Sequence, residues 1–114
     1  MTTASEPARV AFLILSDDPA RAIPGLVMAA RMKSTRGADV RVLFFGPGVK
    51  LAAGGTVDEQ LEALREAEVP TTVCAANVDQ FGVGPEVAER GLTRLSAGAE
   101  VEEFARQGYT VLTF

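Results

Sequence analysis

The sequence of 114 residues contains no histidine, and Cys74 is its only cysteine. Without histidine the chain lacks the most common general base and the most common zinc ligand, so it can form neither a Ser–His or Cys–His pair nor a Cys/His metal cluster. A lone cysteine cannot form a disulfide within the chain, and nothing therefore favours an oxidising compartment. The sequence predicts no metal site and no cofactor.

Excess positive charge and long apolar runs are also absent. The formal net charge is −4 at pH 7, whereas binding to nucleic acid or to an anionic membrane requires clustered Lys and Arg. The nearest basic cluster, Arg31, Lys33 and Arg36, falls in the last turn of a predicted helix, where it complements the helix dipole. Apolar runs reach about six residues, too few to span a bilayer, and residues 1–9 do not resemble a signal peptide. We predict a cytoplasmic protein that binds neither nucleic acid nor membrane.

Length and composition favour one domain over residues 1–114, with a flexible N-terminus at residues 1–7. A domain of this size buries roughly two-thirds of its unfolded surface, which is enough for one core. Hydrophobic residues make up 47% and charged residues 23% of the chain, and this balance is typical of a globular protein.

Five short segments predict strands, and the first two, residues 10–15 and 40–45, are continuous apolar runs. Each run is too short for a helix, and the continuous ones are typical of strands buried on both faces of a parallel sheet. Pro70, near the beginning of the third run, lies where a missing ladder donor is tolerated. The predicted strands are residues 10–15, 40–45, 69–74 or 75, 92–95 and 109–114.

Helical signals separate these strands. Pro24 is expected to interrupt the first helical segment, so that a single turn comes first and the helix proper covers residues 24–35. Thr56 and Glu59 have the spacing of a capping box, which predicts a helix that begins near Val57. The other predicted helical pieces are residues 77–81, capped by Asn77, and residues 85–90 and 99–107.

The alternation of strands and helices along the whole chain predicts the fold class α/β. We expect a three-layer α/β/α domain with a mostly parallel five-stranded sheet and Rossmann-like topology. Loops that follow parallel strands meet at the carboxyl edge of the sheet, where such folds bind their ligands. The loops expected at this edge are residues 16–18, 46–50, 74–77 and 96–98.

Two of these loops have alternative interpretations. Residues 46–50 contain Gly46, Gly48 and one cation, Lys50, but lack the third glycine of a dinucleotide fingerprint and the Lys-Ser/Thr ending of a P-loop. A plain turn therefore competes there with a nucleotide or anion site. Asp17 and Asp18 could form an acid–base pair, although carboxylates at the start of a helix are also explained by capping and by the helix dipole.

Cys74 also has two interpretations. A lone cysteine in an apolar strand is usually a small buried hydrophobe. Cys74, however, is expected at the carboxyl end of a strand and directly before a helical turn, whose backbone N–H groups can stabilise a thiolate. The residues alone leave the packing role and the reactive role open.

Two segments resemble a known family. The stretch VPTTVCAAN at residues 69–77, followed by FGV at 81–83, resembles the cysteine region of DsrE/DsrF-like proteins. The stretch FGPGVKL at residues 45–51 resembles the loop after the second strand in small members of that family. With the last helix, Gly108 and the final strand, the resemblance covers essentially the whole chain and implies a DsrE-like fold.

The resemblance implies a function as well. In the sulfur-relay branch of the family, the cysteine that matches Cys74 carries sulfur as a persulfide and passes it to a partner protein. We therefore expect a sulfurtransferase-like sulfur carrier with Cys74 as the catalytic residue and with sulfur donor and acceptor proteins as partners. The candidate ligand-binding residues around it are Asp17, Gly46, Gly48, Lys50 and Asn77.

Other functions stay open alongside this one. The main alternative is a non-catalytic, oligomeric module that binds a small ligand or serves assembly, and a further one is a nucleotide or anion binder. We also predict a homo-oligomer, because Met28 and Met32 widen the apolar surface of the first helix beyond what one sheet face can cover. For the sulfur carrier, Cys74 is expected to be a partly accessible thiol.

Overall fold

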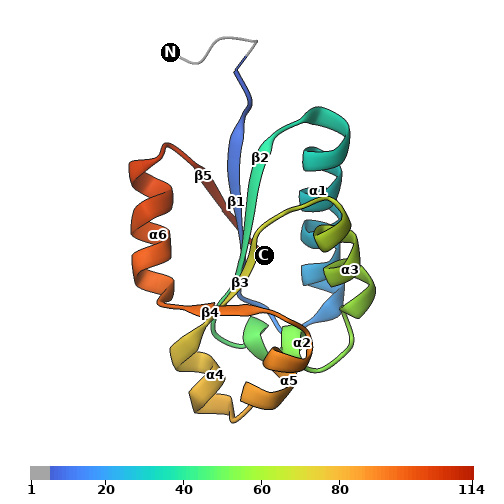
Figure 1. The fold of residues 1–114 in the computed structure, drawn as a ribbon, viewed down its shortest axis with the longest axis vertical. Helices are drawn as coiled ribbons and strands as arrows, with labels where there is room; N and C mark the ends of the chain where they lie inside the picture. Colours follow the sequence, from blue (N-terminus) through green and yellow to red (C-terminus); the bar gives the residue numbers. More distant parts are fainter. Residues whose placement is uncertain (1–5) are drawn as a thin grey trace.

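The computed structural model describes residues 6–114, which form one parallel sheet flanked by helices (Figure 1). In the described residues the sheet has five strands in the order β4-β3-β2-β1-β5, and every neighbouring pair is parallel. This arrangement confirms the predicted fold class. The strands are β1 (Arg9–Ile14), β2 (Asp39–Phe44), β3 (Thr71–Cys74), β4 (Thr93–Leu95) and β5 (Thr110–Thr113).

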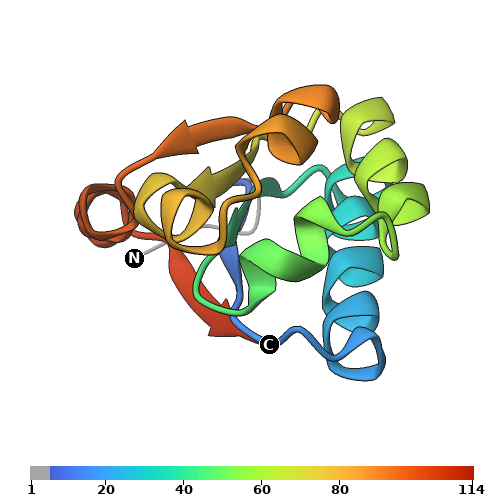
Figure 2. The same ribbon diagram turned by 90° about the horizontal axis from the view of Figure 1, so that it is seen from below.

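The helices cover both faces of the sheet and its carboxyl edge. Helices α1 and α3 cover one face and α6 covers the other, while α2, α4 and α5 gather below the carboxyl ends of the strands (Figures 1 and 2). The cysteine-bearing strand therefore points into a cap of three short helices. The helices are α1 (Pro19–Arg36), α2 (Gly48–Ala53), α3 (Asp58–Glu66), α4 (Ala75–Phe81), α5 (Gly84–Glu89) and α6 (Ala97–Arg106).

One part of the hydrophobic core lies between α1 and the sheet. Phe12, in the middle of β1, stacks on Phe114 with 5.7 Å between the ring centroids. Gly25 of α1 faces the same ring, and a Cβ atom added there would lie 2.7 Å from Phe114 Cγ. The absent side chain at Gly25 thus allows α1 to pack against the end of β5. Each large side chain buried in this layer contributes about 2 kcal/mol of hydrophobic stabilisation.

Another part of the same core, with polar groups at its margin, lies under α6. Phe104 of α6 packs against Tyr109 with 5.5 Å between the ring centroids. The Tyr109 hydroxyl donates a hydrogen bond of 2.7 Å to Asp39 Oδ2, and the Arg41 guanidinium lies 5.7 Å from the Tyr109 ring centroid. These contacts join the residue just before β5 to strand β2.

The expected break at Pro24 is wrong. Helix α1 begins at Pro19, five residues earlier than the helix proper that we expected, and it continues through Pro24 to Arg36. Asp18 caps it by accepting a hydrogen bond of 3.0 Å from Ala20 N. Pro24 removes only the bond to the carbonyl of Ala20, and both residues are exposed, so water can take the place of the missing donor.

Three further expectations are corrected at helix starts. Helix α3 begins at Asp58, close to the predicted position, but no side-chain cap is formed, so the capping box of Thr56 is absent. The loop expected at residues 46–50 is shorter than predicted, because its second half belongs to helix α2. Asn77 lies inside α4 instead of capping it, because α4 already begins at Ala75 with Cys74 at the cap position.

Three further expectations are compared with the described residues. Of residues 1–7, predicted to be flexible, residues 1–5 lie outside the described residues. Met28 on α1 is 47% exposed, whereas Met32, the other methionine of the broad apolar surface, is partly buried against the core. Among the described helices, none is both long enough and apolar enough to cross a membrane.

Candidate functional site

Cys74 lies at the carboxyl end of β3, as predicted. It is the last residue of the strand and the cap residue of α4, and the sheet register pairs it with Leu95 of β4. Its side chain caps no backbone N–H group. The expectation of a partly accessible thiol is wrong, because only 5% of the residue is exposed. Cys74 lies where β3 runs directly into α4, and the local sequence pattern does not report how the fold closes around that point.

Asn77 and Gly46 are brought together by the fold. The Gly46 N–H donates a hydrogen bond of 2.8 Å to Asn77 Oδ1, across a separation of 31 residues. The amide nitrogen of Asn77 in turn donates to Gln80 Oε1 at 2.9 Å, which orients the side chain. Gly46 has φ of +59°, a conformation that favours glycine. This contact ties the end of β2 to the helix that follows Cys74.

Gly48 joins the same region to β1. Its N–H donates to Leu15 O at 2.9 Å and is also 3.2 Å from Phe45 O. A Cβ atom at this position would lie 2.0 Å from Ile14 O. The backbone at the start of α2 therefore lies directly against the end of β1, and this approach excludes any side chain at residue 48.

Lys50 contacts an aromatic ring of the cap. Its Nζ lies 4.9 Å from the centroid of Phe81, the last residue of α4, in the geometry of a cation–π pair. The contact links α2 to α4 and leaves Lys50 exposed. Lys50 thus stands near the cap of the site, as a cation that stabilises the packing of these two helices.

Asp17 lies apart from the other candidates. It is exposed in the loop between β1 and α1, and no described side chain forms a hydrogen bond or ion pair with its carboxylate. The strand order reverses between β1 and β5, so Asp17 is next to this switch point whereas Cys74 is on β3, with β2 and β1 between them. The structure therefore groups Gly46, Gly48, Lys50 and Asn77 at the cap and separates Asp17 from it.

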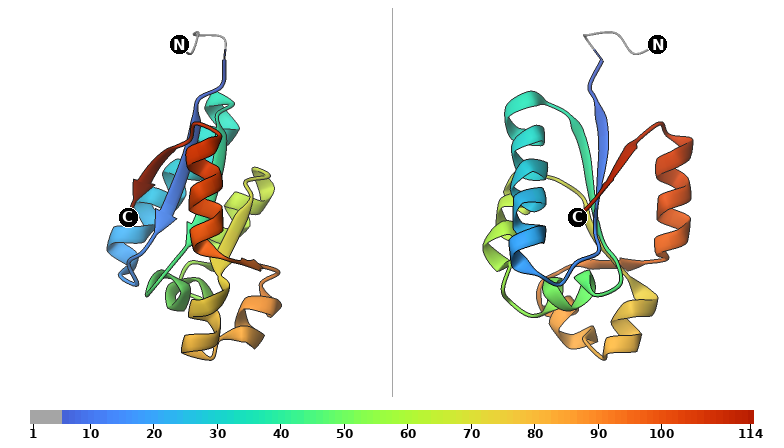
Figure 3. Two further views of the ribbon diagram at one scale, coloured as in Figure 1. Left: turned by 90° about the vertical axis from the view of Figure 1, so that its left-hand side faces the viewer. Right: turned by 180° about the vertical axis from the view of Figure 1, so that it is seen from behind.

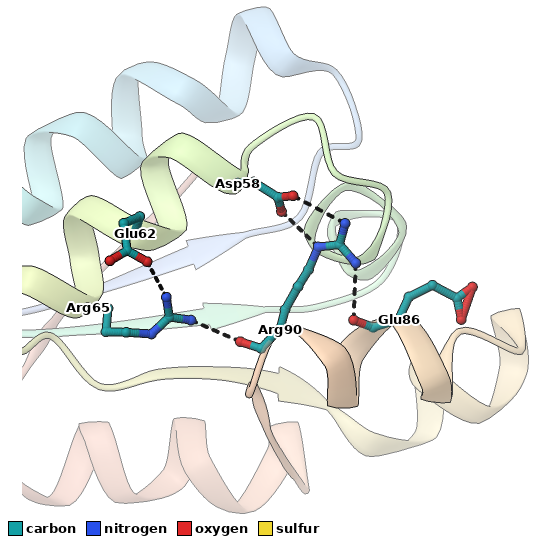
Figure 4. Close-up of polar contacts among 5 residues, drawn as sticks. All are labelled: Asp58, Glu62, Arg65, Glu86 and Arg90. Carbon is teal, nitrogen blue, oxygen red and sulfur yellow. Dashed lines mark hydrogen bonds and ion pairs between the residues drawn. The ribbon is translucent and has the colours of Figure 1, made fainter.

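Arg90 forms a network that sequence reasoning missed (Figure 4). Its guanidinium donates to both carboxylate oxygens of Asp58, at 2.7 and 3.2 Å, and to the Glu86 carbonyl at 3.2 Å. The hydrogen bond to Asp58 raises the pKa of Arg90 above its ordinary value. Arg65, which pairs with Glu62, donates to the Arg90 carbonyl at 3.0 Å. These bonds hold the end of α5 against α3.

Shallow cavities flank this network and do not reach Cys74. One, of about 450 Å³, is lined by Leu61, Arg65 and Arg90 among others, and a second, of about 350 Å³, is lined by Lys50, Val83 and Arg90 among others. Cys74 lines neither of them. Within residues 6–114, no group of three or more His, Cys, Asp and Glu side chains could hold a metal ion. The cap thus offers a buried thiol with an ordered cover and no ligand set for a metal.

Comparison with known proteins places the chain in a fold family. Residues 8–114 match the sequence profile of the DsrE/DsrF-like family. No curated protein gives a significant match. Among solved structures, the chain is similar to a conserved protein of unknown function from Bacteroides thetaiotaomicron, with 19% identity, a TM-score of 0.84, and 92% and 93% of the two chains covered.

Two other solved structures have the same fold. A protein of unknown function from Methanobacterium thermoautotrophicum is 18% identical with a TM-score of 0.79, and the match covers 94% of this chain and 99% of that one. The ychN protein of E. coli is 16% identical with a TM-score of 0.70, and the match covers 93% and 99% of the two chains. At these identities the likeness concerns the fold alone.

Proposed function

This chain belongs to the DsrE/DsrF-like family, and from that premise we propose that it is a sulfur carrier that accepts sulfur as a persulfide on Cys74 and passes it to a partner protein. One observation carries the proposal: the only thiol of the chain lies at the carboxyl end of β3 and directly before α4. In the sulfur-relay branch that the sequence resembles, the sulfur-carrying cysteine is expected at this position, which supports the proposal.

The transfer requires no oxidant or reductant. The Cys74 thiolate attacks the outer sulfur of a donor persulfide, the donor S–S bond breaks, and the donor leaves as a thiolate. Cys74 then carries the outer sulfur as Cys–S–SH. In the second half of the cycle an acceptor thiolate attacks that outer sulfur, and Cys74 is released as a thiolate.

The local structure leaves the sulfur of Cys74 available for transfer. Cys74 makes no capping hydrogen bond with its side chain, so the sulfur is not committed to a structural bond. The first N–H groups of any helix have no acceptor within the helix, and those of α4 follow Cys74 in the chain. Because Cys74 is buried, the incoming sulfur must reach it when the helices of the cap separate. Lys50 and Asn77 link α2 and the end of β2 to α4, so their contacts must loosen if α4 moves away from these elements.

The burial of Cys74 favours a second candidate function. A cysteine that is 5% exposed in the core of a parallel sheet also fits a packing role. In that case the protein is a non-catalytic module that binds a small ligand or a partner protein. The two functions differ in whether the native protein takes up sulfur.

Intact-mass spectrometry after incubation with a low-molecular-weight persulfide distinguishes them. We expect the native protein to gain the mass of one sulfur atom, and dithiothreitol to remove it. Cys74→Ala, which keeps a small apolar side chain in the strand, should gain nothing. If sulfur is added only after the protein is unfolded in urea, Cys74 is a packing residue and the sulfur-carrier function is wrong.

A further inference from the structure

The outer face of α1 carries an apolar groove. In the right-hand view of Figure 3, α1 lies on the outside of the molecule and no other element crosses it. A shallow cavity of about 500 Å³ lies along this face, and within the described residues only α1 lines it. Val27 and Met28 are exposed there. We call this surface the α1 groove; its lining includes Ile23, Val27, Met28 and Met32, with Arg31 and Arg36 toward the end of the helix.

The charge of α1 is opposite to that of the chain as a whole. The helix contains four cations and no carboxylate, whereas the chain has a net charge of −4. Arg21 pairs with Asp18, but within residues 6–114 no carboxylate forms an ion pair with Arg31 or Arg36. The helix dipole accounts for Lys33 and Arg36 in the last turn, but Arg31 lies more than one turn before the end. The groove thus combines apolar side chains with unpaired positive charge.

These two properties define the chemistry of a partner. We propose that the α1 groove binds an acidic amphipathic helix of another protein. Apolar side chains of that helix, repeated at positions i, i+3 or i+4 and i+7, fill the groove, and its carboxylates pair with Arg31 and Arg36. Carboxylates are favoured in the first turn of a helix, so an antiparallel partner presents them at the end of α1 where these cations lie. Residues 23–36 rise about 20 Å along α1, which matches a partner helix of three to four turns.

Charge complementarity favours this occupant over others. The lining of the groove contains no carboxylate, so a second copy that docks through the same face offers Arg31 and Arg36 no counter-ion. A basic segment is repelled by them. An anionic lipid surface attracts larger clusters of Lys and Arg, and the net negative charge of the chain opposes such binding. The docking of an acidic helix does not depend on whether Cys74 carries sulfur.

Fluorescence anisotropy of a labelled peptide with the full chain tests the proposal. The probe is a synthetic amphipathic peptide of about 18 residues, long enough to form a helix, with leucines on one face and glutamates in its first two turns. The control peptide has lysine at each glutamate position. We expect the acidic peptide to bind at least about tenfold more tightly than the basic one, and its affinity to fall as NaCl is raised. Cys74→Ala should bind the acidic peptide as the wild type does, so this result is separate from the sulfur-carrier test.

Substitutions at the surface locate the binding site. The double variant Arg31→Glu/Arg36→Glu should weaken binding of the acidic peptide by more than about tenfold and should bind the basic peptide instead. Lys33→Glu makes the same charge change on the same helix but outside the groove lining, and should have less than about a threefold effect. Val27→Ser should weaken binding by removing an apolar contact, whereas Val111→Ser, at an equally exposed valine on β5, should not.

The circular dichroism spectrum of each variant should match that of the wild type, because the substituted side chains are exposed or half-buried. An acidic peptide that binds no more tightly than the basic one, or that binds the double variant as tightly as the wild type, would overturn the proposal. Sedimentation velocity of the protein alone tests a second copy as the occupant: self-association that Val27→Ser abolishes would assign the groove to it. Sedimentation with phosphatidylglycerol vesicles that the double variant abolishes would assign it to a lipid surface. Either assignment also overturns the proposal.

Discussion

The cap around Cys74 and the outer edge of β5 differ in how their backbone groups are used. At the cap, Gly48 N–H bonds to Leu15 O and Gly46 N–H bonds to Asn77, so loops from three strands are fastened to one another. At β5, the outward groups of Val111 and Thr113 bond to nothing in the described residues. Bonds of this kind between loops make the region sensitive to substitution, whereas an edge with free groups can accept a partner.

The sharpest test of the fastened region is Gly48→Ala. A methyl group at residue 48 would meet Ile14 O at 2.0 Å, so the start of α2 or the end of β1 must move. We expect a loss of about 3 kcal/mol in the free energy of unfolding, measured by urea denaturation. That is a large part of the stability of a small domain.

Gly98 provides the matched control for this change. It lies in α6, and a Cβ atom added there would meet no atom within 4 Å. Gly98→Ala should stabilise the protein by about 0.5 kcal/mol, because alanine has the higher helix propensity. Equal effects of the two substitutions would show that the close approach at Gly48 is not a constraint.

Asn77→Ala tests the second fastening point. It leaves the partly buried Gly46 N–H without its acceptor, and should cost about 1.5 kcal/mol in the free energy of unfolding. Asn77→Asp keeps an acceptor oxygen and should retain most of the stability. Gln80→Ala removes only the partner of the Asn77 amide nitrogen. If Gln80→Ala costs as much as Asn77→Ala, the bond to Gly46 does not anchor α4.

The sequence predicts the sheet much better than the cap. Continuous apolar runs such as residues 10–15 predict strands buried on both faces, because the residue types of the run alone indicate that every side chain avoids water. Helix α2 was missed because Gly46, Pro47 and Gly48 are typical of a turn and the helix has only six residues. Its residues are nevertheless buried, except for the exposed Lys50. Tertiary burial, which no local pattern reports, decided its structure.

The contacts that build the site join residues that are far apart in the sequence. Asn77 has the residue type of a helix cap, but its oxygen accepts from a residue 31 positions away. Arg90 and Asp58 are 32 positions apart, and nothing in either local segment indicates their pairing. Cys74, in contrast, was placed correctly at the carboxyl end of its strand, because that prediction needed only the end of an apolar run. Its burial could not be predicted, since it depends on tertiary packing around the end of β3.

The smallest expected effect concerns the pKa of Tyr109, the residue just before β5. It tests whether the beginning of β5 is fixed while its outer edge is open. Tyr109, the only tyrosine of the chain, is buried and donates to Asp39. Burial first, and then the hydrogen bond to Asp39, raise the pKa of Tyr109 above its ordinary value of about 10, while the positive charge of Arg41 lowers it. The beginning of β5 is thus fixed to β2, in contrast to its open outer edge.

A spectroscopic titration of tyrosinate absorbance against pH reports this anchor directly. The midpoint should lie above that of free tyrosine, fall in Asp39→Ala, and rise further in Arg41→Met. Because the folded state holds the proton more tightly than the unfolded state does, the stabilising contribution is complete below pH of about 10 and is lost as the pH rises through the folded pKa. Unfolding free energies measured over that range should decline for the wild type and stay more nearly constant for Tyr109→Phe, which keeps the ring against Phe104. A wild-type midpoint equal to that of free tyrosine would mean that the beginning of β5 is as open to solvent as its edge.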